Sequence, residues 1–231
     1  MTTTSYTAVI PAAGIGTRMQ SQIPKQYLKV ADKYLIEYCI DTFLQHPKIE
    51  QIIVVIHPED KTFSQLSVAT NSQVHVVIGG AERADSVLAG IEYAKTTLNS
   101  EWVLVHDAAR PGLSMEAISR LIDQVKNTDG GILALPATDT IKQSHDGSVD
   151  KTLDRNRIWM AQTPQMFKTQ ALHNAISQAL ALNIMITDEA SAMEIQGIDV
   201  KLVVGEAANM KVTQPQDLPL VEFYLNQMES D

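Results

Sequence analysis

The sequence has little cysteine and no long apolar run. Cys39 is the single cysteine of 231 residues, so no disulfide can form within the chain, and its place on the apolar face of a predicted helix favours a buried core thiol. The histidines form no cluster with it, which argues against a zinc site. The most apolar segment, IIVVI at 52–56, is far shorter than the roughly 20 residues that cross a bilayer. No signal peptide opens the chain, so we expect a soluble, cytoplasmic protein with no membrane partner.

Basic residues are also few. Lys and Arg number 18 against 27 Asp and Glu, which gives a formal net charge of −9. Broad binding to nucleic acid needs a basic surface, so we exclude nucleic acid as a partner. Any anionic ligand must then be held by a few cations gathered at one place. With 45% hydrophobic and 19% charged residues, the chain has the composition of a globular protein with a sizeable core.

The sequence does contain a regular alternation of short β-branched runs with longer segments of helical period. Near-continuous apolar strands are typical of parallel sheets that are covered on both faces. The predicted strands are 7–11, 51–57, 75–78, 102–106, 131–135 and 201–204, and the predicted helices are 34–46, 86–98, 115–127, 169–182, 188–196 and 215–228. Ser86 and Ser114 stand where helix N-caps are expected. We therefore predict an α/β fold, one doubly wound domain over residues 1–231 with a mostly parallel sheet.

The alternation is interrupted at residues 138–156, which are polar. Asp146-Gly147 lies between two extended runs, and Asp-Gly in that position is a strong hairpin signal. The two runs carry few apolar residues, and an isolated two-stranded hairpin is only marginally stable in water. We therefore predict a β-arm that is stabilised by a second copy of the chain in a homodimer. A surface hairpin without a partner is the alternative.

Small residues follow the first predicted strand, in the string PAAGIGTRM that begins at Pro11. Glycines there let backbone N–H groups approach a phosphate. A dinucleotide-binding fingerprint needs a third glycine where Met19 stands, and a Walker A loop needs Gly-Lys-Ser/Thr, so an NAD-binding module is a weak alternative. Arg18 and Lys25 instead follow the glycines, at the edge where open α/β sheets bind ligands. Two cations at this edge suit a triphosphate, since its charge needs several donors.

A second segment that can carry chemistry is VLVHDAARP at 103–111. Its buried strand delivers Asp107 to the same edge of the sheet, and Arg110 follows. A carboxylate there can hold Mg²⁺, which bridges phosphate oxygens; a capping or turn aspartate is the alternative. We assign His106 a structural role, because a phosphate nucleophile is already ionised at neutral pH and needs no base.

A third segment, GGAERADS at 79–86, leaves a predicted strand and opens a predicted helix. Its glycines and Ser86 offer backbone amides and a hydroxyl to a base or ribose. Helix capping by Asp85 or Ser86 explains the same residues equally well.

Together these segments resemble the 2-C-methyl-D-erythritol 4-phosphate cytidylyltransferase family. The matching strings are PAAGIGTRM, PKQYL, ERADSVLAG, VLVHDAARP, DRNRIWMAQTPQMF, ITDEASAME and NMKVTQPQDL. They run in the family's order over nearly the whole chain. The glycine loop is shared with many nucleotidyltransferases, whereas the HDAARP, QTPQ and TDEAS segments are far more specific.

The resemblance implies a nucleotidyltransferase-type α/β fold with a β-arm that interlocks a homodimer. It implies that CTP and 2-C-methyl-D-erythritol 4-phosphate give the CDP-linked alcohol and pyrophosphate, with Mg²⁺, in the non-mevalonate isoprenoid pathway. The catalytic residues that it implies are Arg18, Lys25, Arg155 and Lys211. The nucleotide-binding residues that it implies are Pro11, Ala12, Ala13, Gly14, Gly16, Thr17, Gly80, Asp85, Ser86 and Ala108. The residues implied for the second substrate are Asp107, Arg110, Thr140, Thr163 and Thr187, with Asp107 also at the metal.

One position departs from the family pattern. Ala208 precedes the Asn of the NMK segment, where many members have an acidic residue, so any contact made there to substrate or metal is not carried over. Two alternatives stay open beside the resemblance: a cytidylyltransferase for another alcohol phosphate, such as ribitol 5-phosphate, and a catalytically silent nucleotide-binding module. Retention of the basic residues and of Asp107 argues against the silent module.

Overall fold

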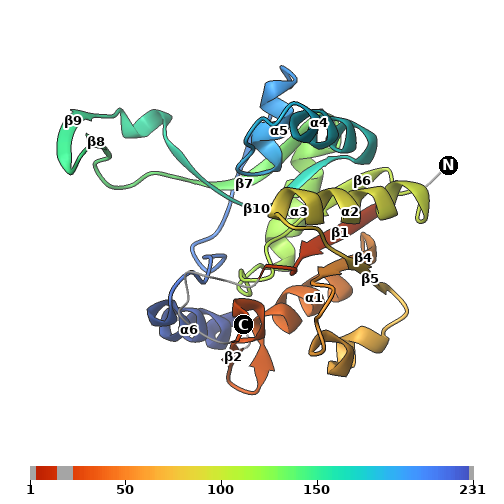
Figure 1. The fold of residues 1–231 in the computed structure, drawn as a ribbon. Coiled ribbons are helices and arrows are strands. Elements are labelled where there is room, and N and C mark those ends of the chain that lie inside the picture. Colours follow the sequence, from red (N-terminus) through yellow and green to blue (C-terminus); the bar gives the residue numbers. More distant parts are fainter. Residues whose placement is uncertain (1–3, 15–22, 229–231) are drawn as a thin grey trace.

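The centre of the molecule is a seven-stranded sheet in the order β11-β7-β10-β6-β1-β4-β5 (Figure 1). The computed structural model describes residues 4–14 and 23–228. The strands of the sheet are β1 (Tyr6–Pro11), β4 (Ile49–Ile56), β5 (Val74–Ile78), β6 (Trp102–Val105), β7 (Gly130–Pro136), β10 (Trp159–Lys168) and β11 (Lys201–Val204). All neighbouring pairs are parallel except those of β10, which runs antiparallel to both β6 and β7. The six predicted strands are confirmed within two residues at either end, and the mostly parallel sheet is confirmed with them.

Strand β10 is the one strand of the seven-stranded sheet that the sequence pattern did not predict. It is inserted between β6 and β7, and its register with β7 shifts between Ala161 and Gln165. Its sequence, WMAQTPQMFK, contains Pro164, a residue that usually argues against a central strand because it cannot donate to the ladder. The register shift takes up this residue, since Pro164 falls in the interval where β10 does not pair with β7.

Helices cover both faces of the sheet, because the side chains of each strand alternate between two separate cores. Ala8 and Ile10 pack with α1 (Leu35–Gln45) and α3 (Met115–Val125) on one face. Val9, between them, packs on the other face with α2 (Arg83–Thr96), α4 (Thr169–Ala181) and α5 (Glu189–Ile195). The doubly wound prediction is confirmed. Cys39 is fully buried in the first core, as predicted.

A smaller third core lies beside the sheet. Helix α6 (Leu218–Met228) packs there against the two-stranded ribbon of β2 (Lys29–Val30) and β3 (Lys33–Tyr34). The 3-10 helices are η2 (Lys25–Tyr27), η3 (Phe63–Gln65), η4 (Ser67–Thr70), η5 (Arg155–Arg157) and η6 (Pro215–Asp217). In the described part of the chain, no helix combines the length and the apolar character needed to span a bilayer.

Of the two predicted helix caps, one is right. The Ser114 side chain accepts a hydrogen bond from the Ala117 N–H at 3.0 Å and caps α3. Ser86 is wrong as a cap, because α2 begins three residues earlier, after Glu82. The Glu82 N–H donates to the Asp85 carboxylate at 3.0 Å, so the first turn is closed by Asp85 and Ser86 already lies inside the helix.

The hairpin predicted from Asp146-Gly147 is present. Strands β8 (Lys142–His145) and β9 (Ser148–Thr152) pair antiparallel, and both turn residues have positive φ, 51° and 81°, as a type I′ turn requires. Every residue of the two strands is exposed. Figure 1 shows the hairpin projecting from the body of the protein on the two long connections that join it to β7 and β10.

Candidate active site

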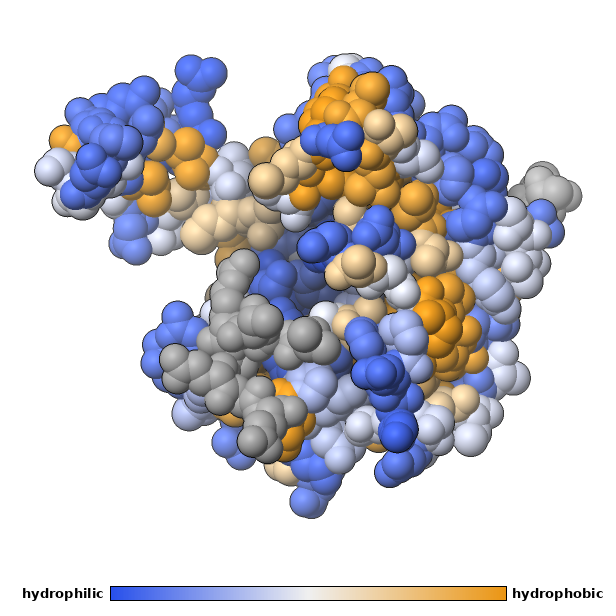
Figure 2. Space-filling model, in the orientation of Figure 1, coloured by the Kyte–Doolittle hydropathy of each residue, from blue (hydrophilic) through white to orange (hydrophobic). Residues whose placement is uncertain are grey.

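A pocket of about 440 Å³ opens where β1, β5 and β6 end. These strands point the same way, so their carboxyl ends share one edge of the sheet, the usual ligand site of an open α/β fold. Figure 2 shows a hollow in the middle of the displayed face, with hydrophilic residues inside it and beside it. The residues proposed from the sequence that line the pocket are Pro11, Ala12, Ala13, Gly14, Lys25, Gly80, Ser86, Asp107, Ala108 and Lys211. Gly16, Thr17 and Arg18 lie outside the described residues.

The first turn of α2 forms one wall of the pocket. The Ser86 hydroxyl accepts from the Gly80 N–H and donates to the Glu82 carbonyl, both at 3.2 Å. A Cβ on Gly80 would come within 2.4 Å of the Asp85 Cβ, so glycine is needed for this close approach. Asp85 itself is not among the residues that line the pocket; its carboxylate is directed back to the helix start. The geometry therefore supports a role for Asp85 in capping α2.

Asp107 gathers three cations at the floor of the pocket. Its Oδ2 accepts from Lys211 Nζ at 2.9 Å and from Arg110 Nε at 3.3 Å, and its Oδ1 accepts from an Arg83 guanidinium nitrogen at 3.3 Å. Burial alone raises the pKa of this carboxyl, but the three cations outweigh burial and hold its pKa well below the usual range. The carboxylate is therefore ionised throughout the neutral range and fixes three positive groups at one edge of the sheet.

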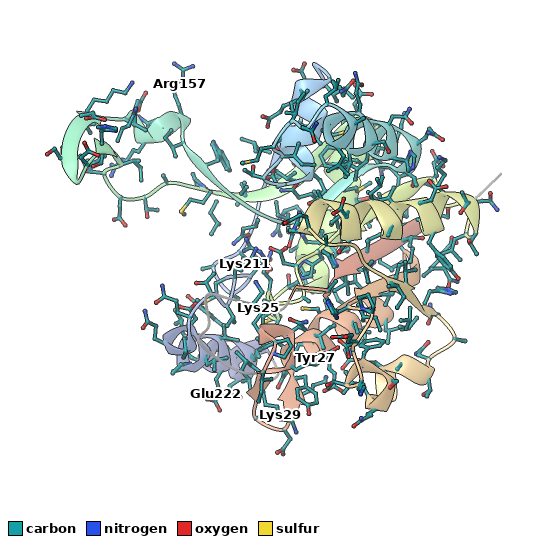
Figure 3. All side chains as sticks on the ribbon, in the orientation of Figure 1. Lys25, Tyr27, Lys29, Arg157, Lys211 and Glu222 are labelled. Atoms are coloured by element: carbon teal, nitrogen blue, oxygen red, sulfur yellow. The ribbon has the colours of Figure 1, made fainter. Side chains whose placement is uncertain are left out.

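Lys25 and Lys211 reach the pocket from opposite ends of the sequence. Lys25 opens η2 behind the glycine loop. Lys211 is held by the main chain next to it, because the Val212 N–H donates to the Ala109 carbonyl at 2.8 Å and Val212 is buried in the third core. Figure 3 shows the two lysines near one another at the pocket, whereas Arg157 of η5 lies far away on the projecting arm.

Arg110 and Thr163 lie behind the pocket and support Asp107 from there. The Thr163 hydroxyl accepts from the Asp107 N–H at 3.0 Å and contacts Nδ1 of His106, also at 3.0 Å. His106 Nε2 lies 3.1 Å from the Arg110 carbonyl, which can only accept, so Nε2 carries the proton of the neutral ring. Burial lowers the pKa of His106 to about 4. The structural role predicted for His106 agrees with this arrangement.

Three residues proposed for the site are away from the pocket in the single chain. Thr140 and Arg155 belong to the projecting arm, where Arg155 donates to the Thr138 carbonyl at 2.7 Å. Thr187 lines a separate small cavity of about 60 Å³ next to α5. Within one chain, the structure brings Lys25, Lys211 and Asp107 together but does not bring the arm residues to them.

Sequence reasoning missed two groups that shape the pocket. Gln26 is buried and its side-chain amide donates to the Ala12 carbonyl at 2.6 Å, which fixes the start of the glycine loop. Arg83 forms a bidentate pair with Glu189, 106 residues away, and reaches Asp107 as well. Arg83 and Glu189 lie in strings that carried the resemblance, ERADS and TDEAS, but no spacing in a single sequence indicates that these two strings meet.

The described side chains of the pocket do not form a complete set of metal ligands. Among residues 4–14 and 23–228, no group of three His, Cys, Asp or Glu side chains could hold a metal ion. The carboxylates that line the pocket are Glu82 and Asp107. Mg²⁺ is commonly bound through one or two carboxylates plus the phosphates of a substrate. One buried carboxylate beside an anion pocket fits a magnesium ion that arrives with a polyphosphate.

A doubly wound, mostly parallel sheet with a cation-lined pocket at the carboxyl ends of its strands is the architecture of nucleotide-binding α/β proteins, a class that includes the nucleotidyltransferases. Comparison with known proteins narrows that class. The sequence model of the 2-C-methyl-D-erythritol 4-phosphate cytidylyltransferase family matches residues 6–227, and the chain belongs to this family.

Individual relatives agree with the family. Enzymes of that name from Vibrio parahaemolyticus and Yersinia pseudotuberculosis are 48% and 49% identical to the chain, each over 96% of it and over 96% and 92% of the relative. A crystal structure of 4-diphosphocytidyl-2C-methyl-D-erythritol synthase is 40% identical, with a TM-score of 0.83 over 96% of this chain and 98% of that one. The enzyme from Thermus thermophilus, at 28% identity, superposes with a TM-score of 0.81 over 96% of this chain and 99% of its own. The resemblance stated from the sequence is confirmed.

Proposed function

We propose that this protein transfers a cytidylyl group from CTP to 2-C-methyl-D-erythritol 4-phosphate. The products are 4-diphosphocytidyl-2-C-methyl-D-erythritol and pyrophosphate, in the non-mevalonate route to isoprenoid precursors. The observation that carries the proposal is the concentration of positive charge in an acidic protein: Lys25, Lys211 and Arg83 line one pocket around a single buried carboxylate. We propose that the enzyme acts in the cytoplasm.

The chemistry needs countercharge more than it needs a nucleophilic side chain. One phosphate oxygen of the alcohol phosphate attacks the α-phosphate of CTP in line, and pyrophosphate leaves. At about 4 Å each pair of like charges repels by roughly 4 kcal/mol at an effective dielectric near 20. Because the attacking phosphate is already ionised, no general base is needed, and neutral His106 keeps its structural role. Preorganised cations lower the barrier by stabilising charge as it builds up.

The roles of the pocket residues follow from their positions. The small residues Ala12 to Gly14, Gly80 and Ala108 leave room for the nucleotide and for backbone donors, and Ser86 offers a hydroxyl. We propose that Lys25, together with Arg18, stabilises the α-phosphate and the leaving pyrophosphate. We propose that Lys211, which donates to Asp107 at 2.9 Å, binds the incoming phosphate.

We propose that the arm residues act on the site of a second subunit. All residues of β8 and β9 are exposed, Val149 at 62%, and an isolated two-stranded hairpin gains little stability by itself. A partner chain would cover the arm, at residues 138–156 of an otherwise single domain, and bring Arg155 and Thr140 to the alcohol-phosphate end of its pocket. This proposal gives a role to two polar residues that are not among the described residues lining the pocket of their own chain.

We propose Mg²⁺ as the metal of the reaction, held by the phosphates of CTP and by Asp107. When bound, the ion neutralises phosphate charge and orients the triphosphate. The protein's own part is to keep Asp107 ionised and correctly placed, which its three cationic neighbours and the Thr163 hydroxyl do.

The reaction is tested by measuring pyrophosphate release from CTP and a panel of alcohol phosphates that contains methylerythritol 4-phosphate and ribitol 5-phosphate. We expect the first to be turned over with by far the highest kcat/KM. Higher kcat/KM with ribitol 5-phosphate would favour the alternative cytidylyltransferase, and no release with any member would refute the proposal.

The arm is tested by mixing two impaired variants, Lys25→Ala and Arg155→Ala, and measuring activity at an alcohol-phosphate concentration well below the KM of Arg155→Ala. If Arg155 serves the partner's pocket, each mixed dimer has one intact site, and free exchange restores about a quarter of wild-type activity. If Arg155 serves its own chain, each of the two sites in a mixed dimer carries one lesion, and mixing restores no activity. Sedimentation of the wild type as a monomer at micromolar concentration would contradict the dimer.

A further inference from the structure

The Arg83 guanidinium is shared between two carboxylates that come from distant parts of the chain. Its two terminal nitrogens reach both oxygens of Glu189, at 2.7 and 3.3 Å. One of the same nitrogens reaches Asp107 at 3.3 Å. Arg83 is the first residue of α2 and Glu189 the first residue of α5, so the fork joins two helix starts and the end of β6.

Burial makes this arrangement different from a surface ion pair. The side chain of Glu189 is 2% exposed and that of Asp107 is 10% exposed. A carboxylate removed from water in this way needs a cation with good geometry, and the planar fork of an arginine supplies two parallel hydrogen bonds at once. The two carboxylates raise the pKa of Arg83 even though burial alone lowers it, so Arg83 keeps its charge.

The place of Glu189 is set by the strand that carries Thr163. Gln165, two residues further along β10, donates to the Asp188 carboxylate at 2.9 Å and accepts from the Ala190 N–H at 2.8 Å. The start of α5 is therefore anchored on both sides of Glu189. Arg83, in turn, lines the pocket together with Gly80. The ion pair thus connects the wall beside the nucleotide to the strand behind Asp107.

We propose that Arg83 and Glu189 are positioning residues of the cytidylyltransferase reaction: Glu189 holds the Arg83 fork, and the fork holds Oδ1 of Asp107 so that Oδ2 keeps Lys211 in place for the phosphates. The inference rests on the proposed function and deepens it. Neither residue needs to touch the reacting atoms, because each acts through Asp107.

The charges of the cluster give the proposal a signature that structural damage does not share. Arg83, Arg110 and Lys211 oppose Asp107 and Glu189, which leaves one net positive charge. Glu189→Gln raises this charge by one and Arg83→Gln lowers it by one. Both changes loosen Asp107, so we expect kcat to fall by about 10- to 100-fold in each variant. CTP affinity should move in opposite directions, by about threefold each, tighter for Glu189→Gln and weaker for Arg83→Gln.

Two further variants separate charge from geometry. The double variant Arg83→Gln/Glu189→Gln restores the net charge, so CTP affinity should return to the wild-type value while kcat falls no further than in the worse single variant. Arg83→Lys keeps the charge but cannot hold two carboxylates with a rigid fork, so it should retain CTP affinity and lose an intermediate part of kcat. Arg120→Gln is the control, because the Arg120 side chain is about as exposed as that of Arg83 and pairs with a glutamate, Glu206 at 2.9 Å, outside the pocket lining; its kcat should be unchanged.

The experiment measures pyrophosphate release at saturating substrates and CTP binding by calorimetry, for variants shown to be folded by circular dichroism. Should Glu189→Gln fail to fold, Arg83→Gln and Arg83→Lys still test the proposal, since the Arg83 side chain is 37% exposed. A kcat within about twofold of wild type in the Arg83 variants overturns it, and so does CTP affinity that falls equally in Arg83→Gln and Glu189→Gln. A wild type that releases no pyrophosphate refutes the proposed function itself, whereas an active wild type with undiminished variants refutes only the positioning role.

Discussion

Replacing Asp107 with asparagine tests the electrostatic centre of the pocket through stability rather than activity. The substitution keeps the size of the side chain but removes the charge that three cations share. Loss of one partner from a fully buried ion pair costs about 3–5 kcal/mol. Here the cost is smaller, because the side chains of Arg83 and Lys211 are 37% and 34% exposed and water screens them.

Neighbouring contacts reduce the loss further. Arg83 keeps its bidentate pair with Glu189, and Arg110 still donates to the Asn209 carbonyl at 2.9 Å. We therefore expect Asp107→Asn to lower the free energy of unfolding by about 2–3 kcal/mol at pH 7. In a chain of this size each kcal/mol shifts the unfolding midpoint by roughly 2–4 °C, so the midpoint should fall by roughly 4–12 °C.

The stability difference between wild type and Asp107→Asn should depend on pH in a direction set by the pKa shift of Asp107. The pKa of Asp107 is lowered in the folded protein, so its contribution to stability is complete above the unfolded pKa of about 3.9 and is lost as the pH falls below that value. Urea unfolding of wild type and variant at pH 7, 5, 4 and 3 should therefore show a difference that is constant down to about pH 4 and then shrinks.

Asp123 provides the control. It also contacts two lysines, Lys48 at 2.8 Å and Lys126 at 3.4 Å, but it lies on the surface, where such pairs contribute little. Asp123→Asn should leave the unfolding midpoint unchanged within error. A midpoint shift as large as that of Asp107→Asn, or an Asp107→Asn difference that does not shrink in acid, would show that burial and the three cations are not the cause.

Three further predictions concern other parts of the molecule. Lys25→Ala should lower kcat by about 10²- to 10³-fold with an unchanged circular dichroism spectrum; pyrophosphate release within about threefold of wild type would remove its catalytic role. Arg155→Ala should raise KM for the alcohol phosphate and leave CTP binding intact, so an equal loss of CTP affinity in calorimetry would contradict its role in the second site. Gly90→Ala should destabilise the fold by about 1–3 kcal/mol in urea unfolding, because a Cβ there meets Val9 at 2.6 Å and Val55 at 2.9 Å; unchanged stability would mean that α2 can move off the sheet freely.

The strands and helices that the sequence indicated are those whose local pattern and tertiary environment agree. Runs such as IIVVI at 52–56 are buried on both faces in a parallel sheet, so composition alone identifies them. The Asp146-Gly147 turn was equally clear, because its backbone angles require those residue types. Strand β10 was missed because it mixes polar residues with Pro164, and its pairing with strands on both sides outweighs that weak local preference.

Some residues of the candidate site could likewise be inferred from the sequence, and others could not. The glycine loop and Asp107 stand directly after predicted strands, and Lys25 follows the glycine loop. Parallel topology brings strand ends together, so their meeting could be inferred. Lys211 could be connected to them only through the family resemblance, because nothing local indicates that it reaches Asp107. The Arg83–Glu189 pair could not be inferred at all, since its partners are 106 residues apart and each reads by itself as an ordinary charge at a helix start.

The strand order also has a consequence for how the protein is made. The strands β5, β4, β1 and β6 are complete once the ribosome has synthesised the first half of the chain. That half also contains Lys25, Arg83 and Asp107. The other side of the sheet must wait for β10, which lies between β6 and β7, and for the late residue Lys211. A polypeptide that stops ahead of residue 211 therefore contains Lys25, Arg83 and Asp107 but lacks Lys211, so the full set of cations around Asp107 exists only once almost the whole chain has been translated.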